Sequence, residues 1–247
     1  MSGYTQAARS GTPPITAPPN FLDTFTRANH NGLGVDWFAA PIGFGSIEPG
    51  QNIYRSVRVE SNKAHFSETV SGSNGQASYR LFPNKLIHPF YDTPRRQMCE
   101  ATFDEYSFTE PFQASLVNLM VMCDLSWTDS LVGYGASFGP GPTFTGFPMR
   151  YNVGFASPPQ GISSTSLSGG NIEFTFTPGD VFRLTVEPID TTHHKVEFLQ
   201  NGVALLSTIA NDANLPQRGI PALFNVYNIP TVDGDTIISR FEGGSAF

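Results

Sequence analysis

The feature that most constrains the fold is a strict alternation of apolar and polar side chains in the C-terminal third. Within the segment Val-Phe-Arg-Leu-Thr-Val-Glu, apolar side chains fall at every second position (Phe182, Leu184 and Val186). This period of two is typical of a β-strand with one buried face. The dipeptide Asn201-Gly202 follows between two apolar segments and predicts a two-residue hairpin, because both residues tolerate positive φ.

Similar short apolar segments recur along the chain, separated by turns. The 247 residues include 24 Gly, 20 Pro and 21 Phe, and only 14% are charged. No segment of ten or more residues has a convincing helical face. We therefore predict an all-β fold in which about a dozen strands form two stacked sheets, a jelly-roll β-sandwich. The predicted strands after Trp37 are Tyr54–Glu60, Lys63–Val70, Gln76–Phe82, Cys99–Tyr106, Gln113–Leu125, Leu131–Phe138, Met149–Ala156, Asn171–Thr177, Val181–Glu187, Val196–Leu199, Val203–Ile209, Ala222–Tyr227 and Thr236–Phe241.

The segment DTFTRANHNGLGVDW, residues 23–37, predicts how the sandwich begins. A short first strand leads into a polar turn and a Gly-x-Gly step. We expect Phe25 and Trp37 to fill the core. Arg27 is expected to pair with Asp23 or with Asp36 at the rim.

This pattern, D-x-F-x-R-A-N-x-x-x-L-G-x-x-W, resembles the opening of the concanavalin-A-like, laminin-G-like sandwich domains of tailed-phage virion proteins, which are common in minor tail proteins. The alternating strand and Asn-Gly hairpin described above resemble the later strands of such domains. The segment from Ile237 to Gly243 resembles their last strand, which returns beside the first. The resemblance covers roughly residues 21 to 243 and implies a concanavalin-A-like jelly roll in a virion protein.

Two regions are predicted along the chain. Residues 1–20 contain two Pro pairs and no hydrophobic periodicity, which indicates an extended N-terminal arm. Residues 21–247 are predicted to form one β-sandwich domain. We expect the arm to dock on adjacent subunits of an assembly.

Charge and hydropathy restrict the partners. The formal net charge of −7 argues against nucleic-acid binding, which needs a basic surface. The N-terminus, Met-Ser-Gly-Tyr-Thr-Gln, has no signal-peptide pattern. The longest apolar stretch, Leu116 to Leu125, is too short to span a bilayer. We therefore expect synthesis in a host cytoplasm, no membrane insertion, and a final location in the virion.

Cys99 and Cys123 are the only cysteines. They lie symmetrically about a turn near Pro111, so an antiparallel hairpin could place them opposite each other. Two alternatives remain at this stage: a cross-strand disulfide, or two small buried thiols, which assembly in a cytoplasm favours.

An enzymatic function would need paired carboxylates, because glycoside hydrolases of this fold place alternating acids along one strand. The nearest fragments hold Glu100 with Asp104, which share a strand face, and Glu187 with Asp190, which Pro188 interrupts. We interpret these acids as outward-facing surface charges and expect that the chain is not an enzyme. The His193-His194 pair is interpreted as a solvated hairpin tip.

Contact residues are sought among aromatic side chains near the two loops of unusual composition, 139–148 and 156–170. Phe144 and Phe147 lie in GPGPTFTGFP, and we expect them either to dock on a partner or to fold back over the domain's own open end. The candidates for partner or glycan contact are Trp127, Tyr134, Phe144, Phe147 and Tyr151.

A calcium ion is the one cofactor considered. Relatives of the fold carry calcium in a rim loop, and Asp233 and Asp235 flank a Gly turn that offers two oxygen ligands, to which Asp124 or Asp129 could add. A plain turn explains the same residues.

The first functional hypothesis is a non-enzymatic structural component of a bacteriophage virion, a minor tail protein before a capsid decoration protein. A lectin-like, receptor-binding module for cell-wall polysaccharide is the alternative, and a wall-glycan hydrolase ranks third. The expected partners are other virion proteins, copies of the chain itself and host polysaccharide.

Overall fold

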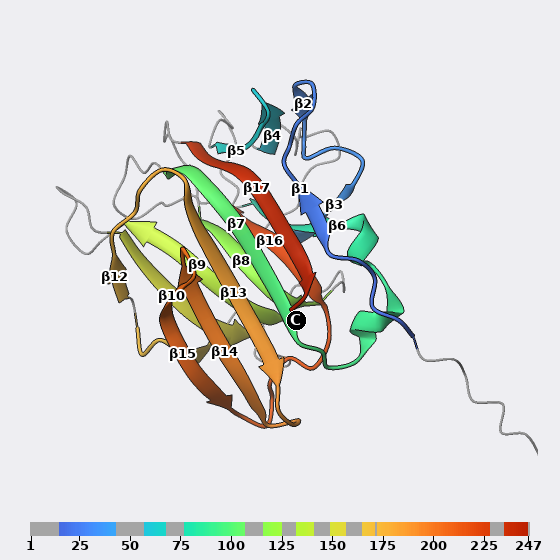
Figure 1. The fold of residues 1–247 in the computed structure, drawn as a ribbon, viewed down its shortest axis with the longest axis vertical. Helices are drawn as coiled ribbons and strands as arrows, with labels where there is room; N and C mark the ends of the chain where they lie inside the picture. Colours follow the sequence, from blue (N-terminus) through green and yellow to red (C-terminus); the bar gives the residue numbers. More distant parts are fainter. Residues whose placement is uncertain are drawn as a thin grey trace, which may run out of the picture.

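The computed structural model describes residues 15–42, 57–67, 77–106, 116–124, 132–140, 149–156, 165–170, 172–227 and 235–246. Two antiparallel sheets stack face to face (Figure 1). The predicted all-β sandwich is therefore confirmed. The two 3-10 helices among these residues, η2 (Asn84–Leu86) and η3 (Pro89–Asp92), are single turns. No helix in the described ranges has the length and hydropathy needed to cross a membrane.

The first sheet, sheet A, has the strand order β15-β14-β13-β7-β17-β5-β4-β2, with β1 also paired to β17. The first and last strands of the chain, β1 and β17, lie side by side in this sheet, as predicted, with Phe21 opposite Gly243. The bounds are β1 Phe21–Asp23, β2 His30–Asn31, β4 Val57–Glu60, β5 Lys63–Ser67, β7 Gln97–Tyr106, β13 Asp180–Pro188, β14 His193–Gln200, β15 Val203–Asn211 and β17 Asp235–Ser245.

The second sheet, sheet B, has the order β11-β10-β9-β8-β16-β6-β3, with β12 also paired to β10. One predicted strand, Asn171–Thr177, is shorter than expected, because only three of its residues pair with β10. The bounds are β3 Trp37–Ile42, β6 Ala77–Pro83, β8 Leu116–Cys123, β9 Gly133–Pro140, β10 Met149–Ala156, β11 Thr165–Ser166, β12 Ile172–Phe174 and β16 Ile220–Tyr227.

The alternating strand and the hairpin behave as the sequence predicts. In β13, Phe182, Leu184 and Val186 are buried in the core. The turn between β14 and β15 has positive φ at both Asn201 (51°) and Gly202 (80°). This twist matches that of the flanking strands, so the turn sets the register of the two nearest pairs, Gln200 with Val203 and Leu199 with Ala204, before a bulge shifts it at Phe198.

Phenylalanine rings join the two sheets. Phe138 of sheet B has its ring centroid 5.2 Å from Phe103, 5.0 Å from Phe182 and 5.6 Å from Phe198, all in sheet A. All four side chains are at most 2% exposed. Burying one such ring contributes roughly 1.5–3 kcal/mol, so this cluster is a main source of cohesion between the layers.

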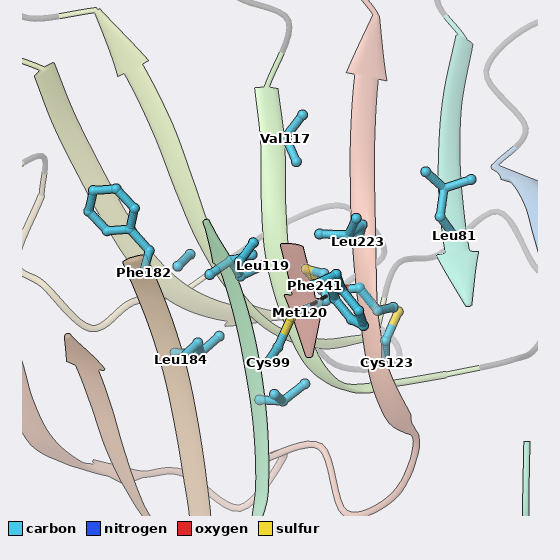
Figure 2. Close-up of a cluster of buried hydrophobic side chains, with 14 of the residues drawn as sticks. Leu81, Cys99, Val117, Leu119, Met120, Cys123, Phe182, Leu184, Leu223 and Phe241 are labelled. Atoms are coloured by element: carbon cyan, nitrogen blue, oxygen red, sulfur yellow. Dashed lines mark hydrogen bonds between the residues drawn. The ribbon is translucent and has the colours of Figure 1, made fainter. Parts of the chain in front are cut away.

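The two cysteines lie in the same core but not in one hairpin. Cys99 belongs to β7 of sheet A and Cys123 to β8 of sheet B, so the predicted hairpin is wrong (Figure 2). The strands β7 and β8 follow each other along the chain but cross from one sheet to the other. Both cysteines are free and buried, and burial raises the pKa of the Cys99 thiol far above its usual range. Of the two alternatives, the structure shows the buried thiols.

The opening segment, residues 23–37, is held by a network of hydrogen bonds around the Asp23 carboxylate. The Asp23 carboxylate accepts hydrogen bonds from both Nη atoms of Arg27 (3.1 and 2.6 Å) and from Trp37 Nε1 (2.7 Å). It also accepts one from the backbone N–H of Phe25 (2.7 Å). Phe25 and Trp37 are buried, as predicted, and Asp23 rather than Asp36 is the partner of Arg27.

The N-terminal arm falls largely outside the described residues, which begin at residue 15. The side chain of Asn20 donates a hydrogen bond to Glu242 of β17 (3.4 Å). The division into an arm of residues 1–20 and a domain of residues 21–247 stays a prediction, as does docking of the arm on other subunits.

Candidate functional site

Of the carboxylates considered for catalysis, Glu100 and Asp104 lie on the outer face of sheet A, and Asp190 lies in the turn between β13 and β14. Glu100 is only 5% exposed. One of its oxygens accepts from Arg183 Nε (2.6 Å), and the other contacts Arg240 Nη1. The interpretation of Glu100 as an ordinary surface charge is therefore wrong, because two arginines cover it.

Asp104, four residues along β7, is also engaged. Its Oδ2 lies 2.7 Å from Lys63 Nζ, and its Oδ1 accepts from the Ser239 hydroxyl at 3.0 Å. A general acid or base must reach the substrate. In this arrangement, Glu100 and Asp104 form ion pairs that tie β7 to β5, β13 and β17.

His194 is not at a solvated tip. Its side chain is fully buried, and its Nδ1 lies 2.8 Å from the hydroxyl of Tyr134. Burial lowers the pKa of His194 and raises that of Tyr134. His193, half-exposed, contacts Asp190 at 2.9 Å. The structure thus corrects two expectations. His194 belongs to the core and not to a solvated hairpin tip. Tyr134, proposed as a contact residue, is also buried in the core and cannot contact a glycan there.

The other candidate contact residues are not tested. Trp127, Phe144, Phe147 and Asp233 lie outside the described residues. The backbone of Tyr151 pairs with Phe138, and that of Asp235 with Ser67, but their side chains are not described. Their roles in glycan contact, docking or calcium binding stay predictions. Within the described ranges, no group of three or more His, Cys, Asp or Glu could hold a metal ion.

A pocket of about 290 Å³ lies where η3 meets the ends of β8 and β16, and we call it the η3 pocket. Figure 1 shows η2 and η3 as the coiled ribbons beside β6. Three chain segments that are far apart in the sequence form its wall. The lining residues are Ile87, His88, Pro89, Tyr91, Asp92, Asp124, Arg218, Gly219 and Ile220.

A β-bulge opens the sheet at this pocket. The register between β8 and β16 shifts between Ile220 and Ala222, and Met122 has a positive φ of 52°. A bulge leaves backbone groups without ladder partners. The fully buried side chain of Gln97 provides hydrogen-bond partners for two of these backbone groups. Its Oε1 accepts from Met122 N (3.0 Å), and its Nε2 donates to Gly219 O (2.8 Å).

Gly219 fixes the floor of the pocket. Its φ is 122°, and an added Cβ would lie 2.4 Å from the carbonyl oxygen of Cys123. Its backbone N–H donates to the carbonyl of Tyr91 in η3 (3.2 Å). Only glycine allows this close approach, so the wall formed by η3 and the wall formed by β16 are held together at this position.

The pocket combines apolar and polar groups. His88 Nδ1 accepts from the backbone N–H of Phe90 (3.1 Å), so in the neutral ring the proton is on Nε2, which can donate. Asp92 and Arg218 are exposed, and neither makes an ion pair or a side-chain hydrogen bond with the described part of the chain. The pocket thus offers donors and acceptors that are available to a ligand.

Sequence reasoning missed this pocket. Its polar lining residues His88, Asp92 and Arg218 belong to no sequence motif. The one local signal is the turn after His88-Pro89, because Pro favours the first position of a helical turn. The bulge that brings residues 218–220 to η3 leaves no pattern in the sequence.

Comparisons with known proteins give the fold. No protein-family model matches the chain, and no curated protein matches it. Among solved structures, a prokaryotic β-1,3-1,4-glucanase (lichenase) from a mouse hindgut metagenome is similar, with TM-score 0.54 and 10% identity over 91% of this chain and 98% of that one. The β-glucanase of Bacillus licheniformis has TM-score 0.52 and 10% identity, over 92% and 98%.

The carbohydrate recognition domain of Emp46p in a metal-free form is also similar, with TM-score 0.49 and 13% identity over 84% of this chain and 87% of that chain. The similarity of the two glucanases confirms the concanavalin-A-like jelly-roll fold that the opening motif implied. At such identities it says nothing further about the site.

One expectation has to be corrected. We expected, in part because the sequence lacks a paired-acid motif, that the chain is not an enzyme. The finding that two glucanases share its fold over nearly its whole length contradicts this expectation. A single fold hosts both binding and hydrolytic sites, so the fold does not exclude catalysis.

Proposed function

We propose that this chain is a carbohydrate-recognition domain of a tailed-phage virion, and that the η3 pocket is where it binds saccharide. The observation that carries the proposal is the pocket itself, which places Asp92, Arg218 and His88 around an apolar surface. Sugars present hydroxyl groups together with C–H faces. A binding site for them therefore needs both hydrogen-bonding groups and apolar contact.

The jelly-roll fold supports the carbohydrate part of the proposal, since the glucanases that share it are named for the polysaccharides on which they act. The opening pattern from Asp23 to Trp37 supports the virion part.

Within the virion, a minor tail protein is the first assignment and a capsid decoration protein the second. Immunogold labelling of particles that contain the chain separates the two, because tail and capsid are distinct in projection.

The test of recognition is binding of the purified protein to host cell-wall polysaccharide, followed by isothermal titration calorimetry. We expect saturable binding that the double variant Asp92→Asn/Arg218→Gln weakens at least tenfold. Glu187→Gln is the matched control. Glu187 does not line the pocket, and its Oε2 lies 3.7 Å from Arg96 Nε. Failure of the wild-type protein to bind any wall fraction would contradict the proposal.

The same preparations should be assayed for new reducing ends, because the glucanase fold admits hydrolysis.

The arm is tested separately by deleting residues 1–14. We expect the truncated chain to keep its saccharide affinity and to enter particles less efficiently than the full chain. Equal incorporation of the two forms would remove the docking role of the arm.

A further inference from the structure

The strand β15 ends the described part of sheet A, and its second half, Leu206–Asn211, carries none of the features that protect the edge of a sheet. We infer that two copies of the chain pair antiparallel along this segment, about a two-fold axis, so that sheet A continues from one copy into the other. This inference goes beyond the proposed function and does not depend on it.

The described terminal strands of the two sheets differ in how their edges are protected. An edge strand presents backbone N–H and C=O groups to other chains, so proteins shorten such strands or place Pro or charged residues in them. The strands β2 and β11 have two residues each, and β3 contains Pro41, which has no N–H to donate. By contrast, β15 has nine residues, Val203–Asn211, and none of them is charged, Pro or Gly. A long edge of this composition is suited to pairing with another strand.

The segment Leu206–Asn211 is the regular part of β15. It follows the bulge at Phe198 and pairs with β14 in one unbroken register. Ser207, Ile209 and Asn211 are exposed, whereas the residues between them are buried or half-buried. The three exposed side chains therefore share the outer face of sheet A. Ile209 is 49% exposed, so about half of this apolar side chain is available for contact with another molecule.

This segment is complementary to itself. With the two-fold axis at Ile209, antiparallel pairing places Ile209 of each copy opposite Ile209 of the other, and Ser207 opposite Asn211. Opposite residues of an antiparallel pair share a face and contact each other, so the two exposed apolar side chains would bury each other between uncharged polar pairs. A two-fold axis uses the β15 edges of both copies, so the assembly closes at two chains and does not grow into a fibre.

The charges beside this edge favour a second copy as the partner. Each chain carries a formal net charge of −7, but the charges next to Ile209 and Ser207 cancel locally. On β14, Lys195 Nζ lies 3.0 Å from Glu197 Oε1, which also accepts from the Ser207 hydroxyl at 3.4 Å. Two copies therefore bring no unpaired like charges together at the axis, whereas a strongly acidic or basic peptide would find no complementary charge there.

Pairing through β15 would leave the η3 pocket open in both copies. In Figure 1, β15 lies at the lower left, and the coiled ribbons η2 and η3 lie on the right. A dimer would therefore present two pockets away from its interface. If the proposed function holds, two linked sites raise the apparent affinity for a polymer with many binding units by roughly 10²–10⁴-fold where the geometry allows both to bind.

Sedimentation velocity of the full-length protein over a range of concentrations tests the interface. We expect a reversible dimer whose dissociation constant rises at least tenfold in Ile209→Lys, because this change places two like charges against each other at the axis. Val203→Lys is the matched control, since Val203 is 68% exposed on the same strand but precedes the bulge. We expect it to dimerise like the wild-type protein.

Cross-linking tests the register. Ile209→Cys should form a disulfide-linked dimer when its thiols are oxidised by copper-phenanthroline, because residues opposite each other across the axis bring their Cβ atoms close together. Val203→Cys should stay unlinked under the same conditions. The natural Cys99 and Cys123 are buried and should not react.

Three results would overturn the inference: a wild-type protein that stays monomeric at every concentration, a dimer that Ile209→Lys leaves unchanged, or a dimer that is lost when residues 1–14 are deleted but kept in Ile209→Lys. The last result would assign association to the arm. None of them touches the proposed function, since the affinity of one pocket for a soluble oligosaccharide should be the same in Ile209→Lys and in the wild-type protein. Thermal unfolding of Ile209→Lys as a monomer should show a folded chain, because the substituted side chain is exposed.

Discussion

The side chain of Asp23 holds together the opening segment of the sandwich, residues 23–37. Its carboxylate accepts from Arg27, from the Trp37 indole and from the backbone of Phe25, which has an unfavourable φ of 54° for a non-glycine residue. Asp23→Asn should lower the free energy of unfolding by about 2 kcal/mol, because it removes the charge of a buried carboxylate that accepts two hydrogen bonds from the partly exposed Arg27 guanidinium. Urea unfolding measures this. Asp36→Asn is the control and should change it by about 0.5 kcal/mol or less; equal effects of the two would refute the assigned pairing.

His194 gives a second prediction at the residue scale. Burial lowers its pKa in the folded state, while Asp190 and Gln217 partly oppose that shift. The unfolded chain therefore binds a proton first as the pH falls below the ordinary histidine value of about 6.5, so stability is full above that pH and falls below it. We expect the free energy of unfolding to decline from pH 7.5 to pH 5 more steeply in the wild-type protein than in His194→Gln. Identical slopes would show that His194 does not titrate in this way.

At the scale of elements, the bulge between β8 and β16 positions the pocket, and Gly219 is its most demanding residue. Gly219→Ala forces a Cβ to within 2.4 Å of the Cys123 carbonyl oxygen, so we expect a loss of at least about 2 kcal/mol in stability, together with loss of saccharide binding. Gly179→Ala is the matched comparison, since its φ is also positive (94°) but nothing lies within 4 Å of an added Cβ. It should cost about 1 kcal/mol and leave binding unchanged. Similar behaviour of both variants in unfolding and calorimetry would contradict this assignment of Gly219.

The same elements show what a sequence can and cannot predict. The alternation in β13 and the Asn201-Gly202 turn are local signals, and both are confirmed. Pairing between distant segments leaves no such signal. Cys99 and Cys123 therefore suggested a hairpin, although β7 pairs with β13 and β17 instead. The pocket depends on this kind of pairing, because the pairing of β16 with β8 brings Gly219 next to Tyr91, more than 120 positions earlier in the chain.

At the scale of the whole molecule, the two sheets form a rigid support, and the candidate site lies at one end of it. The Phe138 cluster holds the layers together, and the ion pairs of Glu100 and Asp104 connect the strands of sheet A on its outer face. Such a support can present a pocket without moving. We therefore expect saccharide binding to cause little change in structure outside the η3 pocket.

The most direct measurement is mapping of amide chemical shifts by nuclear magnetic resonance while a neutral oligosaccharide is added to the full-length protein. The account predicts that the largest changes occur at His88, Asp92, Arg218, Gly219 and Ile220, which line the pocket. Changes centred instead on Glu100 and Arg183, with the pocket residues unaffected, would place the ligand on the outer face of sheet A and contradict the central claim.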